Sequence, residues 1–311
     1  MITRTKLDWK KVIRFSWKNL SYSFFISLTA YILHVVLEVG HISIPPSVVA
    51  ILGGALAILL GFKNASSYDR WWEARKIWGG IVNESRTFTR QALTVVDPDH
   101  IPEDLMKASY ALVHGQIAWV YALRLRLLGI KDRKIWDEQV GVYFEPEDYE
   151  FFMSCSNQVT QIGMHQGRAI KELNAREILD IYSYIQIDDT LTRLTDLQGK
   201  SERIKGTPLP RPYEYYTRFF LVLFILFFPF GMVDTFMELA WPLLIIPVTM
   251  ITGWIFYQIY VFGKVHSDPF EGRETDISLL AIARTIEIDL KEIIGEKDIP
   301  PPLKEENGVL L

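Results

Sequence analysis

The chain has 311 residues, of which 49% are hydrophobic and 23% charged, and its formal net charge is −4. This acidic balance argues against a nucleic-acid-binding protein, which needs a concentrated basic face. Cys155 is the single cysteine, so the chain can form neither an intrachain disulfide nor a cysteine-based metal cluster.

Long apolar stretches stand in two pairs around a polar middle, at residues 20–39, 44–62, 219–233 and 240–263. The second and fourth contain no charged residue and have the length, about 17–25 residues, that crosses a bilayer as a helix. His34 and Glu38 interrupt the first, and the third is short and carries Pro229 and Gly231. We predict an all-α membrane protein with four transmembrane helices per subunit and a large helical cytosolic region.

Lysine and arginine residues flank these stretches on one side only. The connections at 38–46 and 234–242 contain none, whereas the N-terminal segment holds Arg4, Lys6, Lys10, Lys11, Arg14 and Lys18. Basic residues near span ends favour the cytoplasmic side, so we predict two membrane hairpins in a bacterial-type inner membrane, with both termini cytoplasmic. The expected segments are 1–19 (cytosolic N-terminal segment), 20–62 (first hairpin), 63–217 (helical cytosolic region), 218–263 (second hairpin) and 264–311 (cytosolic helix and tail).

The polar middle shows helical periodicity. Residues 64–96 predict a helix that stops at Asp97-Pro98-Asp99, and residues 102–130, 158–173 and 175–197 predict further helices. The uncharged segment 108–123 is too short for a fifth span and would reverse the pattern of basic residues, so we expect it to be buried among other helices. A last amphipathic helix is expected at 277–294, and the sequence holds no motif typical of an enzyme site.

Two motifs at the ends of apolar stretches point to a family. Directly after the second stretch the chain reads Arg70-Trp71-Trp72, and just beyond the fourth it reads Asp268-Pro269-Phe270. Both resemble motifs of the bestrophin family, and the likeness extends over residues 20–290. The resemblance implies a homopentameric ion channel in which the second span of each subunit lines a central pore. We expect no cofactor, and the expected partners are monovalent ions, the lipid bilayer and further copies of the chain.

The resemblance also implies a narrow neck, formed by residues of the second span that lie one helical turn apart. Counting back from Arg70, these positions are Gly54, Ile58 and Phe62, which a spacing of four places along one side of a helix. The family usually has a bulky apolar residue at the outermost position, so Gly54 predicts a neck formed mainly by Ile58 and Phe62. An apolar ring can act as a gate because a narrow hydrophobic passage sheds water. The alternative is that these residues face lipid or pack against other helices.

Two sites in the polar regions follow from the same resemblance. Ile181 and Ile185 are candidates for a second, cytosolic constriction, although their apolar stripe is also typical of plain helix packing. That stripe consists of Ile178, Ile181, Tyr182 and Ile185. Animal bestrophins bind calcium through an acidic run after the second motif, and here Arg273 interrupts the run that ends at Asp276. Calcium favours several oxygen ligands, so Asp276 is a weak candidate and we expect no metal site.

Aromatic and ionisable residues mark the ends of the spans. Trp71 and Trp72 are expected to anchor at the membrane interface rather than to bind ions. His34 and Glu38 lie near the outer end of the first span, where we expect them to extend to solvent or to line the outer mouth.

Alternative functions remain open at this point. We expect passive conduction of small monovalent ions: the resemblance implies chloride or other anions, while the acidic balance and Asp69 below the neck favour cations such as sodium in a bacterial member. A membrane-anchored helical scaffold, or an enzyme with its site in the polar middle, is one alternative. A secondary transporter is disfavoured because the charge-free second and fourth spans offer no ligands for an ion at mid-membrane.

Overall fold

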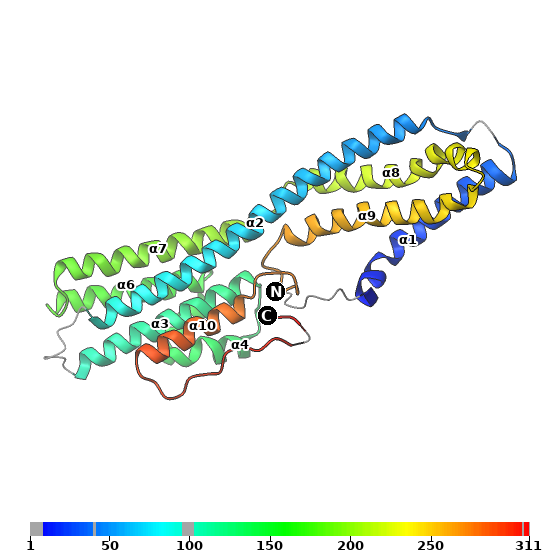
Figure 1. Ribbon diagram of the computed structural model, residues 1–311. Coiled ribbons are helices and arrows are strands. Elements are labelled where there is room, and N and C mark those ends of the chain that lie inside the picture. The colour runs from blue at the N-terminus through cyan, green and yellow to red at the C-terminus, as the bar shows by residue number, and fades with distance from the viewer. Residues whose placement is uncertain (1–8, 40–41, 95–102, 307, 311) are drawn as a thin grey trace. The chain divides into compact units, whose positions relative to one another are not determined.

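A computed structural model describes residues 9–39, 42–94, 103–306 and 308–310 (Figure 1). Within these residues the chain is helical, and the only β-type pairing is an isolated bridge between Glu306 and Val309. The elements are α1 Trp9–Tyr31, the π-helix η1 Ile32–Val36, α2 Pro46–Thr94, α3 Glu103–Leu127, α4 Arg133–Gln139, η4 Gly141–Tyr143, α5 Pro146–Ser154, α6 Gln158–Ala175, α7 Ile181–Gly206, α8 Arg211–Glu238, η5 Pro242–Leu244, α9 Ile245–His266 and α10 Leu279–Ile293. The basic residues Arg4 and Lys6 and the expected stop at Asp97-Pro98-Asp99 lie outside the described residues.

The chain divides into two compact units. We call Arg4–Trp71 with Pro208–Asp268 the spanning unit, and Trp72–Thr207 with Pro269–Leu311 the polar unit. The boundaries between the two units fall at Trp71/Trp72, Thr207/Pro208 and Asp268/Pro269, outside the apolar stretches. The helices that contain the apolar stretches continue beyond them into polar sequence. The boundaries expected from hydropathy, at residues 62, 217 and 263, therefore mark the ends of apolar runs rather than the ends of helices.

The four predicted spans are present in the described chain, as Lys11–Val36, Pro46–Thr94, Arg211–Glu238 and Pro242–His266. In the spanning unit α1 packs along α9 and α8, and α8 packs along α9 (Figure 1). Leu56 and Leu60 of α2 are buried in the apolar core that α8 and α9 complete, where the rings of Phe224 and Phe256 lie 4.7 Å apart. A small apolar core of aliphatic and aromatic side chains thus holds the helices of the spanning unit together.

Polar and small residues join α1 to α9. The Ser16 hydroxyl accepts hydrogen bonds from Trp254 Nε1 (3.2 Å) and Gln258 Nε2 (2.5 Å), and Asn19 Nδ2 donates to the Gly253 carbonyl (3.1 Å). A Cβ added at Gly253 would lie 2.7 Å from the Ser23 hydroxyl. Small residues that let backbones approach, with hydrogen bonds between helices, are typical of association inside a membrane.

The third span is longer than its apolar stretch predicts. The helix α8 begins at Arg211, directly after Pro210, and has Pro212 in its first turn, where a proline's missing N–H needs no partner. Pro229 lies inside the helix and does not end it. A Cβ at Gly231 would lie 2.3 Å from Val49, so this glycine allows α8 to approach α2 closely.

The second span and the following polar helix form one element, whereas the sequence predicted two. The helix α2 has 49 residues, which corresponds to about 74 Å at 1.5 Å per residue. Residues 62–78 contain no proline and no glycine, so nothing in the backbone stops the helix where the apolar run ends. Since the apolar core of a bilayer is about 30 Å thick, much of α2 lies outside it.

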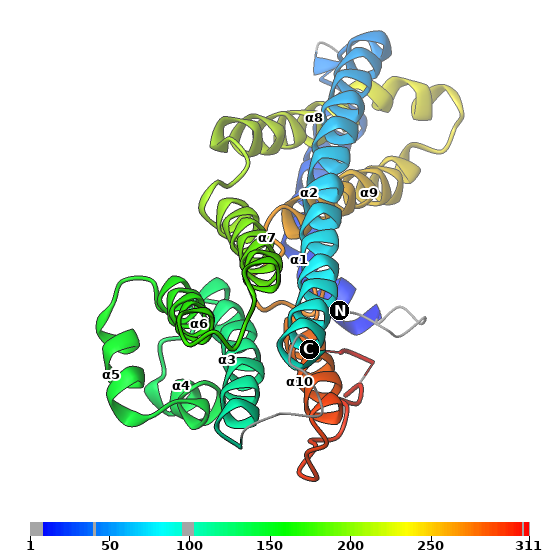
Figure 2. The same ribbon diagram turned by 90° about the vertical axis from the view of Figure 1, so that its left-hand side faces the viewer.

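The polar unit is built around α3. Nearly every residue from 112 to 125 is buried, and α3 packs against α4, α6, α7 and α10 (Figure 2). Inside this core Gln116 donates to the Ser85 hydroxyl at 2.9 Å and accepts from Gln166 at 3.2 Å. The segment 108–123 is therefore an internal helix, as its length and flanking charges predicted.

Three elements of the polar unit differ from expectation. The short helices α4 and α5 were missed, although Asp132 caps α4 through its side chain and Pro146 starts α5. The predicted helix at 175–197 was misplaced, because α6 runs to Ala175 and α7 begins only at Ile181. Asp180 is the N-cap of α7, accepting hydrogen bonds from the backbone N–H groups of Tyr182 and Ser183 at 2.8 and 3.2 Å.

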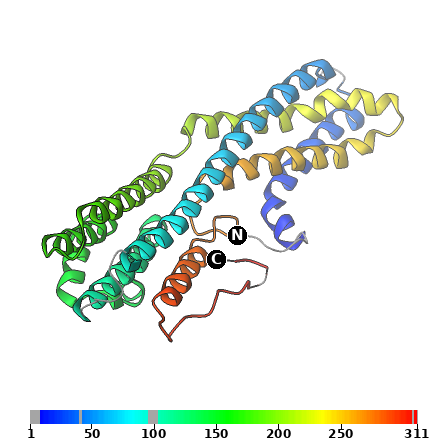
Figure 3. The ribbon, with the colours of Figure 1, turned by 60° about the vertical axis from the view of Figure 1, so that its left-hand side comes forward.

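The C-terminal helix α10 covers α3 through a buried polar cluster (Figure 3). Glu287 accepts hydrogen bonds from Tyr121 (2.6 Å) and Tyr143 (3.2 Å). Its carboxylate also lies 3.2 Å from Arg284 and 3.3 Å from Lys291. Burial, with Glu287 nearby, raises the pKa of both tyrosine hydroxyls above the ordinary value, so they remain donors at neutral pH.

Candidate ion pathway

One face of α2 is exposed along the positions predicted for the neck. Gly54, Ile58 and Phe62 all lie on the surface of the chain, and the side chains of Ile58 and Phe62 are 63% and 65% exposed. The opposite face carries Leu56 and Leu60, which are buried against α8 and α9. The charge-free half of α2 is thus packed on one side and uncovered on the other.

The two neighbouring glycines of α2 have different surroundings. A Cβ added at Gly53 would lie 2.9 Å from the ring of Phe224, whereas one at Gly54 would meet nothing within 4 Å. Gly53 therefore permits the close packing of α2 on α8 that small residues provide in membranes. Gly54 simply leaves space on the exposed face.

An apolar groove of about 570 Å³ runs along the same region, between α2 and α8. Its lining consists of Leu52, Ala55, Leu56, Ile58, Leu59, Phe62, Phe220 and Leu223. Ile58 and Phe62 therefore share a surface with α8, and lipid or a neighbouring helix could cover it. If Ile58 and Phe62 face lipid or pack against another helix, this groove is where the contact would be. The exposure of Ile58 and Phe62 is compatible both with this alternative and with a pore-lining role.

The Arg70-Trp71-Trp72 motif lies in the middle of α2 rather than after its end. The ring of Tyr68 stacks on Trp71 with centroids 6.4 Å apart, and Trp72 is partly exposed. Trp71 and Trp72 lie about two and a half turns beyond the apolar stretch, and amphipathic aromatic side chains near the ends of spans are typical of anchors at the bilayer interface. Their predicted role as interface anchors stays a prediction.

The second motif, Asp268-Pro269-Phe270, follows the end of α9 and contains one buried ring. Phe270 is buried, and its carbonyl accepts a hydrogen bond from Lys205 Nζ at 2.9 Å. The same ammonium group lies 2.9 Å from Glu271. Asp268 accepts from the Ser267 hydroxyl at 3.2 Å, and Pro269 follows it in a turn. Phe270 and Lys205 therefore order the start of the loop that leads to α10.

Asp276 stabilises that loop from within. One of its carboxylate oxygens accepts the backbone N–H groups of Glu271 (2.8 Å) and Arg273 (3.0 Å), around a turn in which Gly272 has φ +74°. Burial raises the pKa of the Asp276 carboxyl, and the two N–H groups partly offset this effect. The described residues contain no group of three or more His, Cys, Asp or Glu side chains placed to hold a metal ion.

The candidate cytosolic constriction lies at the start of α7. Ile181 and Ile185 are 53% and 56% exposed, and the side of α7 that packs inside the chain is formed by later residues such as Ile187 and Leu194. Packing within the subunit therefore does not explain these two isoleucines. Ile178 lies before the helix begins, so the four-residue stripe predicted from the sequence is not one helical face.

The structure joins two ionisable residues that the sequence placed separately. His34 lies in the π-helix η1, and its Nε2 is 2.7 Å from a carboxylate oxygen of Asp234 on α8. The expectation that His34 extends to solvent is wrong, because its side chain is 10% exposed and contacts Asp234; the alternative that it lines the outer mouth stays a prediction. The two residues stand at the ends of the first and third spans that lead into the short connections without basic residues, and that shared level was the available signal.

A second pair was missed on the opposite side. Lys63 was assigned to the basic flank of the second span, yet its side chain is only 4% exposed and forms an ion pair with Glu214 at the start of α8. Both residues sit where an apolar run meets polar sequence, at ends of spans predicted to lie on the same side. That coincidence of opposite charges was the signal in the sequence.

Comparison with known proteins gives a consistent picture. The sequence profile of the family described as bacterial/fungal bestrophin protein matches residues 9–292. A voltage-dependent anion channel-forming protein of Ralstonia nicotianae is 27% identical over 96% of both chains, and one of Mesorhizobium japonicum is 30% identical over 86% of this chain and 80% of its own. The crystal structure of a bacterial bestrophin homologue from Klebsiella pneumoniae is 25% identical, with a TM-score of 0.80 over 89% of this chain and 98% of that one.

Proposed function

Because this chain belongs to the bacterial/fungal bestrophin family, we propose that it is the subunit of an oligomeric channel that passively conducts small monovalent anions. The family consists of ion channels and not of enzymes, which removes a catalytic site in the polar unit from consideration. The choice of anions rests on the relatives from Ralstonia and Mesorhizobium, both named as voltage-dependent anion channel-forming proteins.

The observation that carries the proposal is the uncovered face of α2. Gly54, Ile58 and Phe62 follow one another at single-turn spacing on the exposed side of a charge-free span. When copies of the chain surround an axis, this face forms rings of apolar side chains that dewet when narrow, and a bare ion then meets a high desolvation barrier. Ile58 and Phe62 form the neck, and Gly54 leaves its outer end wider.

The oligomer is a homopentamer, as the resemblance to bestrophins implies. Native mass spectrometry or light scattering of the protein in detergent should give the mass of five 36.0 kDa subunits. A monomer or dimer under conditions that preserve activity would exclude a central pore lined by five copies of α2.

The membrane orientation places both termini and the polar unit in the cytosol. Cys155, the single cysteine, lies in the polar unit and is partly exposed, so it reports the side of the membrane directly. A membrane-impermeant maleimide should label it in inside-out vesicles and leave it unlabelled in intact cells. Labelling in intact cells would show that the polar unit lies outside the cytosol and that the proposed orientation is wrong.

Conduction of sodium is the second candidate, and exposed carboxylates favour it. Asp69 lies two turns beyond Phe62 on α2, and Asp180 precedes Ile181 at the proposed cytosolic constriction. A hydrogen bond from the Ser183 hydroxyl, with backbone N–H groups, holds the pKa of Asp180 below its ordinary value, so it is ionised at neutral pH. Rings of such groups attract cations.

Reversal potentials of the purified protein in a planar bilayer separate these functions. Under a gradient of sodium chloride the anion channel reverses toward the chloride equilibrium potential, and the sodium channel reverses toward that of sodium. Asp69→Asn should change selectivity only in the second case. Absence of current from correctly assembled protein would contradict both and favour a membrane-anchored scaffold.

A further inference from the structure

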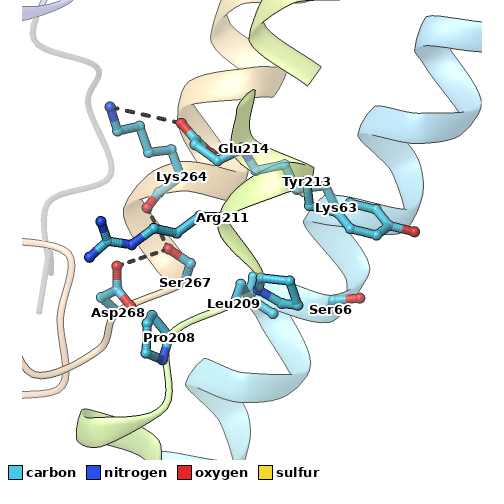
Figure 4. Close-up of a pocket in the computed structure, with 11 residues that line it drawn as sticks. Lys63, Ser66, Pro208, Leu209, Arg211, Tyr213, Glu214, Lys264, Ser267 and Asp268 are labelled. Atoms are coloured by element: carbon cyan, nitrogen blue, oxygen red, sulfur yellow. Dashed lines mark hydrogen bonds and ion pairs between the residues drawn. The ribbon is translucent and has the colours of Figure 1, made fainter. Parts of the chain in front are cut away.

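The spanning unit contains a pocket of about 440 Å³ where three of its helices meet polar sequence (Figure 4). It lies between α2 after its apolar run, the first turn of α8, and the last turn of α9 together with the two residues that follow it. The lining consists of Lys63, Ser66, Pro208, Leu209, Pro210, Arg211, Tyr213, Glu214, Lys264, Ser267 and Asp268.

The innermost charges of the pocket neutralise one another. Lys63 is buried and forms an ion pair with Glu214, and Tyr260 donates a hydrogen bond to the same carboxylate. The ammonium group of Lys63 also lies over the ring of Tyr260, 4.3 Å from its centroid. This inner cluster holds α2, α8 and α9 together and leaves Glu214 with its acceptor capacity largely used.

Two cations remain at the mouth of the pocket. Lys264 Nζ is 3.9 Å from Glu214, at the limit of an ion pair, and its side chain is 60% exposed. Arg211 is exposed and forms no ion pair or hydrogen bond among the described residues. Figure 4 shows its guanidinium on the side of Ser267 and Asp268. Arginine and lysine are the residues that recognise phosphate oxygens; here Arg211 has no partner among the described residues, and Lys264 has only the long contact with Glu214.

The backbone adds to this positive potential. Pro210 is the N-cap of α8 and supplies no side-chain acceptor; in the first turn Pro212 has no N–H, and the Tyr213 N–H donates to the Pro210 carbonyl at 3.0 Å. The positive end of the dipole of this 28-residue helix therefore lies at the pocket, beside Arg211 and the Ser66 and Ser267 hydroxyls. The positive end of the helix dipole and the side chains of Arg211 and Lys264 together favour an oxyanion.

From this arrangement we propose that the pocket binds an anionic phosphate group, with an anionic phospholipid headgroup as its source. The pocket stands where apolar runs of α2, α8 and α9 end, which is the depth of headgroups in a bilayer, and Tyr213, Tyr215 and Tyr216 are exposed along the same turns of α8. Basic pockets between transmembrane helices bind such headgroups. The proposal rests on the four spans and is separate from ion conduction.

Asp268 opposes phosphate binding and provides a sharp test. Its carboxylate lines the pocket next to Ser267, from which it accepts a hydrogen bond at 3.2 Å. A phosphate bound by Arg211 and Lys264 experiences repulsion from this group. Asp268→Asn removes the charge, can keep the hydrogen bond, and should raise phospholipid retention several-fold.

The experiment measures lipid retention by native mass spectrometry of the full-length protein, with phosphatidylglycerol and zwitterionic phosphatidylcholine as probes. Arg211→Gln combined with Lys264→Gln should lower the affinity for phosphatidylglycerol about tenfold, because each cation contributes independently. Arg14→Gln combined with Lys18→Gln is the matched control: it removes two exposed basic residues of α1 that do not line the pocket. It should leave retention unchanged.

Inorganic phosphate distinguishes the two sources of the group. If it fails to displace phosphatidylglycerol from the parent protein, the site is specific for the lipid; if it displaces the lipid and this competition is lost in the Arg211/Lys264 variant, the site accepts free phosphate. Equal retention by the parent and this variant, or equal losses in both variant pairs, would overturn the proposal. Should the Arg211/Lys264 variant not assemble, unchanged retention in Asp268→Asn would overturn it instead.

Discussion

The apolar half of α2 and the middle of α3 have the same kind of sequence and opposite surroundings. Residues 44–62 and 108–123 both lack charged side chains. Helices of the polar unit bury α3 on nearly all sides, whereas α2 leaves Gly54, Ile58 and Phe62 uncovered. Hydropathy indicates that a segment avoids water. Whether it is buried within its own chain or left uncovered for lipid or another subunit depends on the helices packed around it.

The most direct way to sharpen this comparison is the same substitution in both helices. Ile117 of α3 is 1% exposed and Ile58 of α2 is 63% exposed. Ile117→Ala should lower the free energy of unfolding by about 2–5 kcal/mol, because it removes buried methyl groups and leaves a cavity. Ile58→Ala should lower it far less. Thermal unfolding of the detergent-solubilised protein measures both.

A large loss of stability in Ile58→Ala would contradict the contrast between an uncovered α2 and a buried α3. It would mean that the exposed face of α2 is a tightly packed interface between copies rather than the wall of a pore. Ile117→Ala serves as the internal standard, since its burial inside one chain does not depend on assembly.

The second prediction concerns current rather than stability. Ile58→Ala combined with Phe62→Ala widens an apolar ring in every subunit at once, so the neck should wet more easily and current should rise several-fold. The ratio of anion to cation permeability should change little, because no charge is removed. Single-channel recording separates open probability from conductance.

A matched control exists on another span. Ile251 and Ile255 of α9 have the same i, i+4 spacing and are also exposed, at 57% and 45%. Their double alanine variant should leave current unchanged if these residues face lipid. If the two double variants behave alike, or if Ile58→Ala/Phe62→Ala conducts like the parent in an intact oligomer, the assignment of the neck is wrong.

The cover that α10 provides for α3 depends on the loop before it, and this gives the third prediction. Asp276→Ala removes the acceptor of two backbone N–H groups and should cost about 1–3 kcal/mol of stability. Asp276→Asn keeps an acceptor and removes the buried charge, so at neutral pH it should be at least as stable as the parent. Thermal unfolding of the three proteins provides the ranking.

The difference in stability between the parent and Asp276→Asn should depend on pH in a definite direction. Burial raises the pKa of Asp276 in the folded state above its ordinary value of 3.8, so the folded protein binds the proton more tightly than the unfolded chain. The contribution of this group to stability is therefore full at low pH and falls as pH rises through the raised pKa. The advantage of Asp276→Asn should shrink on acidification, and an advantage that grows instead would contradict the assigned direction.

Much of the fold could be predicted from local pattern. The four spans, the internal position of 108–123 and the family motifs follow from hydropathy, flanking charge and a short specific sequence. The spans and the internal segment depend on the composition of many residues together, so they can be predicted without knowing which side chains touch. The length of α8 was missed because Tyr213 to Arg218 are polar or aromatic and yet continue a helix that begins at Arg211.

The contacts of single side chains could not be predicted in the same way. The Lys63–Glu214 and His34–Asp234 pairs each join residues from helices distant in the sequence, so their shared level at the ends of spans indicates them and no local pattern does. Asp180 illustrates the opposite error: its role as an N-cap was visible in the sequence, but the apolar stripe through Ile178 drew the predicted helix too far toward its N-terminus. At this boundary the N-cap side chain, rather than apolar periodicity, determines where the helix begins.

The smallest effect is expected from calcium, in the same loop that orders α10. A calcium ion needs several oxygen ligands in one place, and here the carboxylate of Asp276 already accepts two N–H groups while Arg273 stands within the acidic run. Micromolar calcium should therefore change neither the unfolding temperature nor the current, and chelation should have no effect. Magnesium at equal ionic strength controls for screening of surface charge. A steep dependence on calcium that disappears in Asp276→Ala, but persists in a variant of a carboxylate outside the loop such as Asp137→Ala, would show that the loop rearranges to bind the ion.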